Sequence, residues 1–368
     1  MASPSTTTSS LASRLRESTT YVPVLAAVAL ALFWGRHPND LALVALVPLL
    51  GGAVFAAVHH AEVVAHRVGE PFGSLLLAVA VTVIEVGLIV MLMTSDKDTS
   101  TLARDTVFSA VMICLNGIVG LVLLVGALRH HLANFNPEGT GAALATVISL
   151  ASLTLVLPRF STSEPGPEFT ASQLAFAAIA SLALYGMFVF TQTVRHREFF
   201  LPVDVDGDGI EDAHEVSDAE ARWSLGLLLV SLVAVVGLAK IESSGIERAV
   251  AAAGLPQAFV GVVIALLVLA PETIAAVRAG LRNKVQTGLN LAYGSAMASI
   301  GLTIPAIAVA SIWLDGPLTL GLTSVQIVLL VMSCFVGILT VVPGRAKPLQ
   351  GGVHLVLLAA FVFLSIKP

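Results

Sequence analysis

Apolar residues fill this chain in long runs that short polar breaks separate. Runs of about 17–25 apolar residues recur from one end to the other, and an α-helix of this length crosses a bilayer. Within the bilayer every backbone polar group has to be paired inside such a helix. The pattern therefore predicts an all-α polytopic membrane protein with about eleven transmembrane helices. We expect these helices at residues 21–35, 41–58, 72–94, 105–128, 139–157, 171–194, 223–241, 257–279, 285–313, 318–342 and 350–366.

The composition agrees with this pattern and excludes several classes of function. The chain has 368 residues, of which 56% are hydrophobic and only 12% are charged, whereas a soluble domain carries about 25% charged residues. The two cysteines, Cys114 and Cys334, both fall within apolar runs, so no disulfide framework or zinc site is expected. The chain has no phosphate loop, no ATPase signature and no redox motif, which argues against an enzyme or an ATP-driven pump. We expect no nucleic-acid partner.

The polar breaks carry an uneven distribution of positive charge. Of the 19 lysines and arginines, 12 fall on one side of the predicted helices and 7 on the other. Positive residues are enriched on the cytoplasmic side, so we expect a cytoplasmic N-terminus and an external C-terminus in the cell (inner) membrane. Residues 1–20 are rich in serine and threonine, lack a signal-peptide cleavage pattern and are expected to form a disordered tail.

The longest polar break, residues 195–222, divides the chain into related parts. A first transmembrane helix in residues 21–40 precedes a five-helix repeat in residues 41–194, and a second five-helix repeat follows in residues 223–368. Because five is odd, the two repeats must have opposite orientations in the membrane. Inverted repeats that meet at the bilayer midplane are a common plan of secondary transporters.

One glutamate interrupts an apolar run in each predicted repeat. Glu85 lies in the run at residues 72–93, and Glu272 lies in the run at residues 259–277. A carboxylate at this depth is costly unless it is protonated, paired or bound to a cation, so such residues are functional candidates. One in each repeat predicts a single shared ion site, and a Ser-Ala pair follows each glutamate at similar spacing, 109–110 and 295–296.

Polar and helix-breaking residues around the two glutamates extend this candidate site. Pro271 directly precedes Glu272, removes one helix hydrogen bond and leaves a carbonyl oxygen without its usual partner. Thr82 lies one turn before Glu85, and Asn116 is a polar residue in the middle of the next span. The alternative is that these groups only pack helices together, which small and hydroxyl residues commonly do in membranes. The span after Glu272 adds Gly294, Ser295, Ser299, Gly301, Thr303 and Pro305.

Two carboxylates that converge in an apolar environment suit a divalent cation. Calcium takes six to eight oxygen ligands and accepts carboxylates, carbonyls and water. After the cation leaves, both carboxylates cannot stay charged, and protons bind in its place. Competition between a cation and protons at one site, together with alternating access, produces antiport.

The break between the repeats contains a second candidate calcium site. Residues 204–215 read DVDGDGIEDAHE and match a twelve-residue calcium-binding loop. The alternative is a solvated acidic linker, because the flanking residues are not those of an ordinary EF-hand. If the loop binds calcium, it also provides a means of regulation. The expected ligands are Asp204, Asp206, Asp208, the carbonyl of Ile210, Asp212 through water, and Glu215.

Two long motifs resemble those of a known family. Residues 69–90 read GEPFGSLLLAVAVTVIEVGLIV, and Pro271 and Glu272 precede RAGLRNKVQTGLNLAYGSAMASIGLTIP at 278–305. These stretches resemble the two α-repeats of the ChaA-type calcium/proton antiporters, which belong to the calcium/cation antiporter superfamily with the vacuolar cation/proton exchangers. The resemblance covers essentially the whole chain. It implies that Glu85 and Glu272 bind the cation and the protons in turn.

The motifs depart from the vacuolar exchangers in front of both glutamates. Those exchangers usually read Gly-Asn-Ala-x-Glu, whereas this chain reads VTVIE at 81–85 and VLAPE at 268–272. ChaA-type proteins are also associated with sodium and potassium exchange, so the motifs leave the identity of the transported cation open.

The sequence therefore predicts a secondary transporter that exports cytoplasmic Ca²⁺ in exchange for H⁺. The first alternative is a Na⁺/H⁺ or K⁺/H⁺ antiporter that uses the same two carboxylates. The second is a calcium-responsive membrane protein without transport, in which the loop is a sensor and the glutamates are structural. The expected partners are the transported ions and the lipid bilayer, and the sequence leaves a homo-oligomer open.

Overall fold

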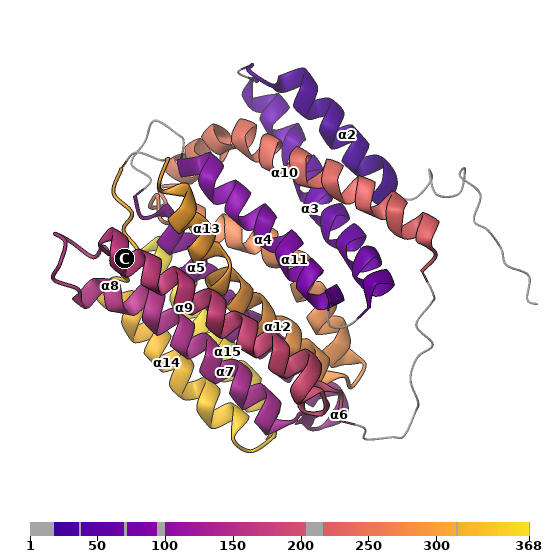
Figure 1. Ribbon diagram of the computed structural model, residues 1–368, viewed down its shortest axis with the longest axis vertical. Coiled ribbons are helices and arrows are strands. Elements are labelled where there is room, and N and C mark those ends of the chain that lie inside the picture. The colour runs from indigo at the N-terminus through magenta and orange to yellow at the C-terminus, as the bar shows by residue number, and fades with distance from the viewer. Residues whose placement is uncertain are drawn as a thin grey trace, which may run out of the picture.

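The computed structural model describes residues 18–36, 38–69, 72–93, 100–203, 216–313 and 316–367, and nearly all of them are helical (Figure 1). Residues 113–118, 152–156 and 191–195 are π-helical, and residues 197–200 form a 3₁₀-helix. In chain order the elements are α2 (Ser18–Phe33), α3 (Asp40–Val68), α4 (Phe72–Met93), α5 (Leu102–Met112), η1 (Ile113–Ile118), α6 (Val119–His130), β1 (Ala133–Asn134), α7 (Pro137–Ala151), η2 (Ser152–Val156), α8 (Leu157–Phe160), α9 (Ala171–Phe190), η3 (Thr191–Arg195), η4 (Arg197–Phe200), α10 (Asp218–Ala252), α11 (Phe259–Leu281), α12 (Val285–Gly301), α13 (Thr303–Ala310), α14 (Ser324–Val341), β2 (Arg345–Ala346) and α15 (Pro348–Ile366).

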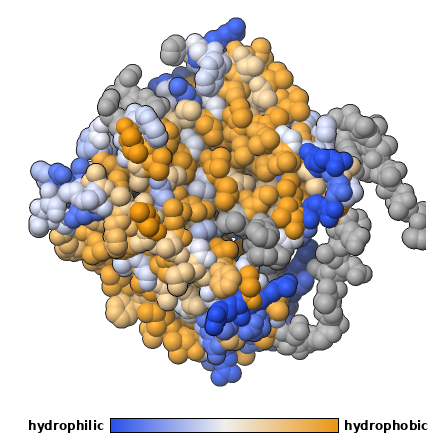
Figure 2. All heavy atoms as spheres, in the orientation of Figure 1, coloured by the Kyte–Doolittle hydropathy of each residue, from blue (hydrophilic) through white to orange (hydrophobic). Residues whose placement is uncertain are grey.

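The described helices confirm the predicted class of an all-helical membrane protein. Nine of them are long and apolar enough to cross a bilayer, and two shorter apolar helices cover Ser18–Phe33 and Val79–Met93. The count of eleven spans stays a prediction. Apolar side chains cover most of the face in Figure 2, and hydrophilic ones gather at its margins. Continuous apolar surface of this extent is suited to contact with lipid.

Polar side chains fix the points at which several helices begin. The side chains of Asn39, Asn136 and Ser217 accept hydrogen bonds from the first backbone N–H groups of α3, α7 and α10. Thr170 and Thr323 form reciprocal capping boxes, each with a glutamine three residues later. Such caps satisfy N–H groups that have no partner within the helix.

Several helices differ at their ends from the predicted spans. Helix α2 begins at Ser18, so the last residues of the predicted tail are helical, while residues 1–17 lie outside the described residues. Helix α3 continues beyond residue 58 to Val68, and α10 runs from Asp218 to Ala252 instead of from 223 to 241. The physical reason is that charged residues end an apolar run without ending a helix, because a polar helix can continue into the interfacial region.

The helices of the two halves contact one another in a reciprocal pattern. Helix α4 packs on α12 and α13, and its counterpart α11 packs on α5, η1 and α6. In the same way, α9 packs on α12 and α13, whereas α15 packs on η1 and α6. The first helices of the halves, α3 and α10, contact each other. Each half therefore supplies the same kinds of contact to the other, as inverted repeats do.

Short extended segments repeat this relation outside the helices. Strand β1, which follows α6, pairs antiparallel with β2, which lies between α14 and α15. A second bridge joins Glu168, between α8 and α9, to Thr319, between α13 and α14. In each pair, the segment before the fourth helix of one half meets the segment before the fifth helix of the other. The two connections are therefore equivalent under the exchange of the halves.

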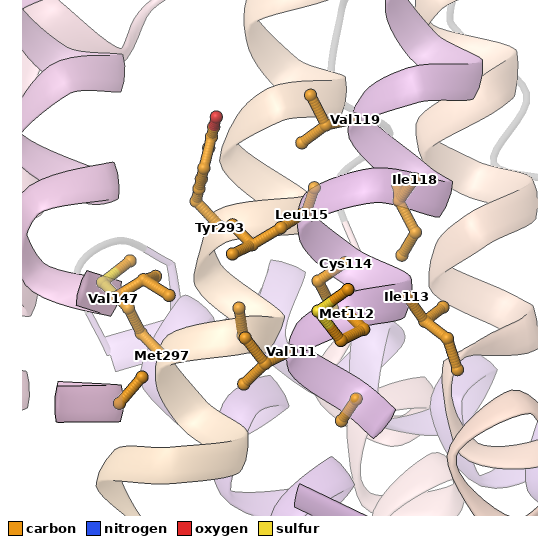
Figure 3. Close-up of a cluster of buried hydrophobic side chains, with 14 of the residues drawn as sticks. Val111, Met112, Ile113, Cys114, Leu115, Ile118, Val119, Val147, Tyr293 and Met297 are labelled. Atoms are coloured by element: carbon orange, nitrogen blue, oxygen red, sulfur yellow. The ribbon is translucent and has the colours of Figure 1, made fainter. Parts of the chain in front are cut away.

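The third helix of each half forms the centre of the molecule. The most apolar stretch of each helix is 78% buried in Leu102–His130 and 67% buried in Val285–Ala310, but only 17% buried in α15. Beside η1, the side chain of Leu115 lies next to Tyr293 of α12 (Figure 3). These two helices are shielded from lipid, so polar residues on them have to find partners inside the protein.

Candidate functional site

A buried cavity lies between the two halves. Its volume is about 200 Å³, and α4, α9, η3, α11 and α12 line it. Both glutamates that the sequence singles out are on its wall. The polar lining residues are Thr82, Glu85, Tyr185, Gln192, Glu272, Thr287, Asn290, Ser295 and Ser299.

Glu85 comes from the middle of α4 and is 3% exposed. Its Oε2 atom accepts hydrogen bonds from Ser299 Oγ at 2.9 Å and from Thr303 Oγ1 at 3.2 Å. The two donors are four residues apart in the sequence and approach from the same side, one from α12 and one from α13. Oε1 has no hydrogen-bond partner among the described residues. One oxygen of Glu85 is thus positioned by the other half, and the second is available to a ligand.

Glu272 occupies the corresponding place on α11 and is 7% exposed. Ser295 of α12 interacts with its carboxyl group. Oε2 lacks a hydrogen-bond partner in the part of the chain that the structure describes. The two glutamates therefore reach one cavity from opposite halves, and each presents an oxygen without a partner.

Pro271 does not break α11, which runs through it without interruption. A proline has no N–H group, so the carbonyl of Leu267, four residues earlier, loses its α-helical partner. The predicted effect of Pro271 on the backbone is therefore local. Pro271 itself is not among the residues that line the cavity.

The structure brings together most of the predicted supporting residues. Thr82, Ser295 and Ser299 all line the cavity, and Thr82 Oγ1 is a third buried oxygen without a partner among the described residues. Buried polar atoms of native proteins are nearly always paired, so unpaired oxygens on a cavity wall are suited to binding a cation or water. Thr303 contributes through its bond to Glu85.

Asn116 lies in η1, and its side chain contacts other helices instead of the cavity. Its side-chain amide donates to Ser333 Oγ at 2.8 Å, and its oxygen is 3.4 Å from His354 Nδ1. Thr340 Oγ1 is 3.2 Å from the other ring nitrogen of His354. Asn116 does not line the cavity; it connects η1 to α14 and α15. Its polarity is explained by a buried network between helices, which was the alternative interpretation of such residues.

Three polar residues at the end of the cavity were not predicted from the sequence. Gln192 belongs to η3, and Thr287 and Asn290 belong to the first turns of α12. Asn290 donates to the backbone oxygen of Phe200 at 2.6 Å. Their signal is a polar group every three or four residues at the end of an apolar run, which is also typical of ordinary helix ends. These residues show that the cavity extends toward the end of the bundle at which α9 and η3 end.

The arrangement offers oxygen ligands and little else. Within the described ranges no three His, Cys, Asp or Glu side chains are grouped closely enough to hold a metal ion. The cavity instead combines two carboxylates with hydroxyl groups and leaves room for water. Hard cations such as calcium or sodium accept such ligands, whereas zinc and copper prefer nitrogen and sulfur. The predicted calcium loop at 204–215 lies outside the described residues.

Comparisons with known proteins identify relatives along most of the chain. The model of the sodium/calcium exchanger protein family matches residues 41–194 and 223–367. The putative ionic transporter y4hA of Sinorhizobium fredii is 47% identical over 87% of both chains. The sodium-potassium/proton antiporter ChaA of Escherichia coli is 35% identical over 95% of this chain and 96% of its own. A Ca²⁺/H⁺ antiporter of Aphanothece halophytica is 25% identical over 94% of this chain and 90% of its own.

Solved structures share the fold at low sequence identity. The H⁺/Ca²⁺ exchanger CAX superposes with a TM-score of 0.71 at 14% identity, covering 94% of this chain and 87% of its own. The structure of native YfkE has a TM-score of 0.69 at 16% identity, covering 95% and 99%. The arrangement of the helices is therefore that of an exchanger fold.

Proposed function

Because the chain belongs to the sodium/calcium exchanger protein family, we propose that it is a cation/proton antiporter that exports cytoplasmic calcium in exchange for protons. The observation that carries this proposal is the meeting of Glu85 and Glu272 on one buried cavity. Each glutamate comes from a different half of the molecule. A group shared by two inverted halves is accessible from either side when the halves rearrange.

In the proposed cycle the cation binds between the two carboxylates. The unpartnered oxygens of Glu85, Glu272 and Thr82 are available as ligands. Ser299 and Thr303 hold the other oxygen of Glu85, so that this carboxylate does not rotate when the cation leaves. Water and backbone carbonyls complete the coordination, because calcium takes six to eight oxygens.

Protons return through the same two groups. Without the cation, two buried carboxylates repel each other and are poorly solvated, so they bind protons. The cation and the protons therefore compete for one site, and neither ligand needs a separate binding pocket. This competition couples the two ion flows, because the empty, doubly charged site is costly to move through the membrane.

A specific observation favours a second candidate, a sodium or potassium/proton antiporter. The Escherichia coli relative named as a sodium-potassium/proton antiporter is more similar to this chain than the relative named as a Ca²⁺/H⁺ antiporter in Aphanothece halophytica. The same two carboxylates serve a monovalent cation if only one of them ionises. We place calcium first because two converging carboxylates match a divalent charge.

The first prediction separates these candidates in everted membrane vesicles that are acidic inside. Addition of calcium is expected to release protons and to relieve the quenching of a pH-sensitive dye. Sodium or potassium at equal ionic strength is expected to give a much smaller signal, because one positive charge only partly neutralises two carboxylates. Vesicles from cells without the protein are the control.

Other outcomes of this assay have definite meanings. A response to sodium or potassium but not to calcium supports the second candidate. The absence of a response to all three cations rejects antiport and leaves a calcium-responsive membrane protein without transport.

We propose that the loop at residues 204–215 binds calcium on the cytoplasmic side and regulates transport. The proposal rests on its match to the calcium-binding pattern. The second prediction replaces Asp204, Asp206 and Glu215 together by Asn, Asn and Gln. The half-saturating calcium concentration in everted vesicles is then expected to shift by about fivefold or more, with the maximal exchange rate retained.

A matched control exists within the same loop. Glu211 occupies position eight, which is not a ligand position, so Glu211→Gln removes charge without removing a predicted ligand. Loss of all transport in the triple variant, with the protein folded and inserted, would make the loop part of the ion path. Identical behaviour of the triple variant, the control and the original protein would reduce the loop to an acidic linker.

A further inference from the structure

Buried oxygens without partners also occur away from the cavity, at the beginning of α5. Asp105 is 3% exposed and Thr106 is fully buried, yet Asp105 Oδ2 and Thr106 Oγ1 have no hydrogen-bond partner among the described residues. Ser181 and Glu242 carry such atoms too, so the lack of a partner alone defines no site. The position of Asp105 and Thr106, between the two halves, is what distinguishes them.

Asp105 lines a small second pocket of about 20 Å³, which is room for one water molecule or ion. The pocket lies where α4 ends and α5 and α11 begin, beside the last turns of α10. All polar side chains in its lining carry oxygen: Thr101, Asp105, Glu247 and Gln257. Its chemistry therefore resembles that of the main cavity.

This pocket is at the opposite end of the bundle from the polar end of the cavity. Helix α11 begins beside the pocket and ends at Leu281, just before the first turns of α12 that line the cavity. Its 23 residues correspond to about 35 Å of helix. Glu272 lies between these two ends, so the pocket and the polar end of the cavity are on opposite sides of the candidate ion site.

The pocket and the cavity each lie where a third helix of one half contacts a second helix of the other. The cavity lies where the start of α12, a third helix, faces α4, a second helix. The pocket lies where the start of α5, the other third helix, faces α11, the other second helix. The exchange of the halves relates these two helix contacts, whereas the remaining walls differ, because α9 completes the cavity and α10 completes the pocket. In this conformation the cavity has a volume of about 200 Å³ and the pocket only about 20 Å³.

We call the side of the bundle that holds this pocket the far side. Close packing and a buried ion pair close it. A Cβ atom at Gly261 of α11 would lie 2.8 Å from Thr106 N and 2.9 Å from the carbonyl carbon of Asp105, so the backbones of α5 and α11 touch. Asp105 Oδ1 accepts from Arg104 Nε at 2.9 Å and from Gln326 Nε2 at 3.2 Å. Arg104 also reaches the backbone oxygen of Gly321. These contacts occupy one oxygen of Asp105 and leave Oδ2 and Thr106 Oγ1 unused.

We propose that the α5–α11 contact is the closed outer half of the ion path, and that Asp105, Thr106 and Glu247 bind the cation there on its release. The proposal rests on the proposed antiport function, and it assigns ligands beyond the two central glutamates. When α5 and α11 separate, Asp105 Oδ2 and Thr106 Oγ1 become accessible to the cation that leaves Glu272. Glu247 of α10 lies at the outer pocket and receives it next.

The charges around the pocket favour release over tight binding. Arg104 pairs with Asp105 and neutralises much of its charge. A site on a permeation path has to bind strongly enough for the ion to enter and weakly enough for it to leave. A pair of unneutralised carboxylates, as in the central cavity, would retain a divalent cation. The outer carboxylates are thus suited to a low-affinity step.

The third prediction uses Thr106→Val, which distinguishes a role of Thr106 as a cation ligand from a structural role. Valine has nearly the shape of threonine, and Thr106 Oγ1 makes no hydrogen bond that the substitution would break. Removal of an unpaired buried hydroxyl is neutral or stabilising for a folded protein. We expect unchanged or higher thermal stability of the purified protein, but an increase of about fivefold in half-saturating calcium on the outer face.

The measurement compares the two faces of the membrane. Right-side-out vesicles expose the far face, which holds the pocket, and everted vesicles expose the cavity face, toward which the polar end of the cavity extends. The interior of both kinds of vesicle is acidified before calcium is added outside. Glu247→Gln is expected to raise half-saturating calcium about tenfold in right-side-out vesicles and to change it little in everted ones. Glu164→Gln is the matched control, because Glu164 is exposed in the segment between α8 and α9 and lines neither pocket.

The outcomes distinguish this proposal from the proposed function. If the original protein exchanges no cation in either type of vesicle, the antiport function fails. If the original protein exchanges calcium, and both Thr106→Val and Glu247→Gln have its half-saturating calcium concentration on the far face, the assignment of the outer ligands is wrong. Equal changes on both faces would assign these residues a general structural role and would also overturn the proposal.

Discussion

Replacement of Glu272 by Gln is expected to abolish cation/proton exchange while the protein remains folded in the membrane. Glutamine keeps the length and most of the hydrogen bonding of glutamate, but it neither neutralises a cation nor takes up a proton. Both halves of the cycle therefore fail together. We expect less than about 1% of the original exchange rate, because a charged ligand of a buried cation is worth several kcal/mol.

Glu85→Gln is expected to have the same effect, because the two carboxylates act as one site. Its hydrogen bonds from Ser299 and Thr303 survive, since an amide oxygen also accepts. The purified variants are reconstituted in liposomes, and proton release on calcium addition is compared with that of Glu164→Gln. Near-normal exchange by Glu272→Gln would remove this residue from the mechanism, and a lower melting temperature would point to misfolding.

The two glutamates were predictable from the sequence because the cost of a charge in an apolar helix is a local property. Each lies in a run that is long enough to span a membrane, and no tertiary information is needed to recognise the conflict. The hydroxyl residues after Glu272 were predictable for a related reason. Ser295, Ser299 and Thr303 follow at helical spacing, so they share one face. This face meets both glutamates, because Ser295 interacts with Glu272 while Ser299 and Thr303 donate to Glu85.

The direction in which Asn116 points was not predictable. A polar residue inside a span has to find a partner, but the sequence does not say on which neighbouring helix. The π-helical turn η1 shifts the register of α5 relative to α6. Asn116 lies within this turn and meets Ser333 and His354 instead of the cavity. Such a shift depends on packing between helices that are far apart in the sequence.

The far-side contact was not predictable either. Arg104 and Asp105 are adjacent in the sequence and resemble an ordinary polar helix start. Their partners, Gly321 and Gln326, are more than 200 positions away. The sequence predicted two related halves, but only the fold identifies which helix starts lie against which second helices. An inverted arrangement creates two equivalent contacts, and one sequence does not specify which of them is closed.

Gly261 is the position where this closure is most sensitive to added volume. Its Cβ would be too close to backbone atoms of Asp105 and Thr106, and backbone cannot move aside as a flexible side chain can. Gly261→Ala therefore has to push α5 and α11 apart. Overpacking of this kind costs about 1–3 kcal/mol. Applied to one conformation of a two-state transporter, it changes the ratio of the two states by about five- to 150-fold.

We therefore expect Gly261→Ala to reduce maximal exchange about tenfold or more, because the conformation with a closed far side becomes rare. Gly186→Ala on α9 is the matched control, since a Cβ there meets no atom within 4 Å and alanine favours a helix. The first measurement is the maximal exchange rate in vesicles. The second is the rate at which a membrane-impermeant thiol reagent, added from the far side, labels Glu247→Cys with and without Gly261→Ala. Faster labelling with slower exchange is the expected result. Unchanged rate and labelling would mean that α5 and α11 are not in close contact when the transporter works.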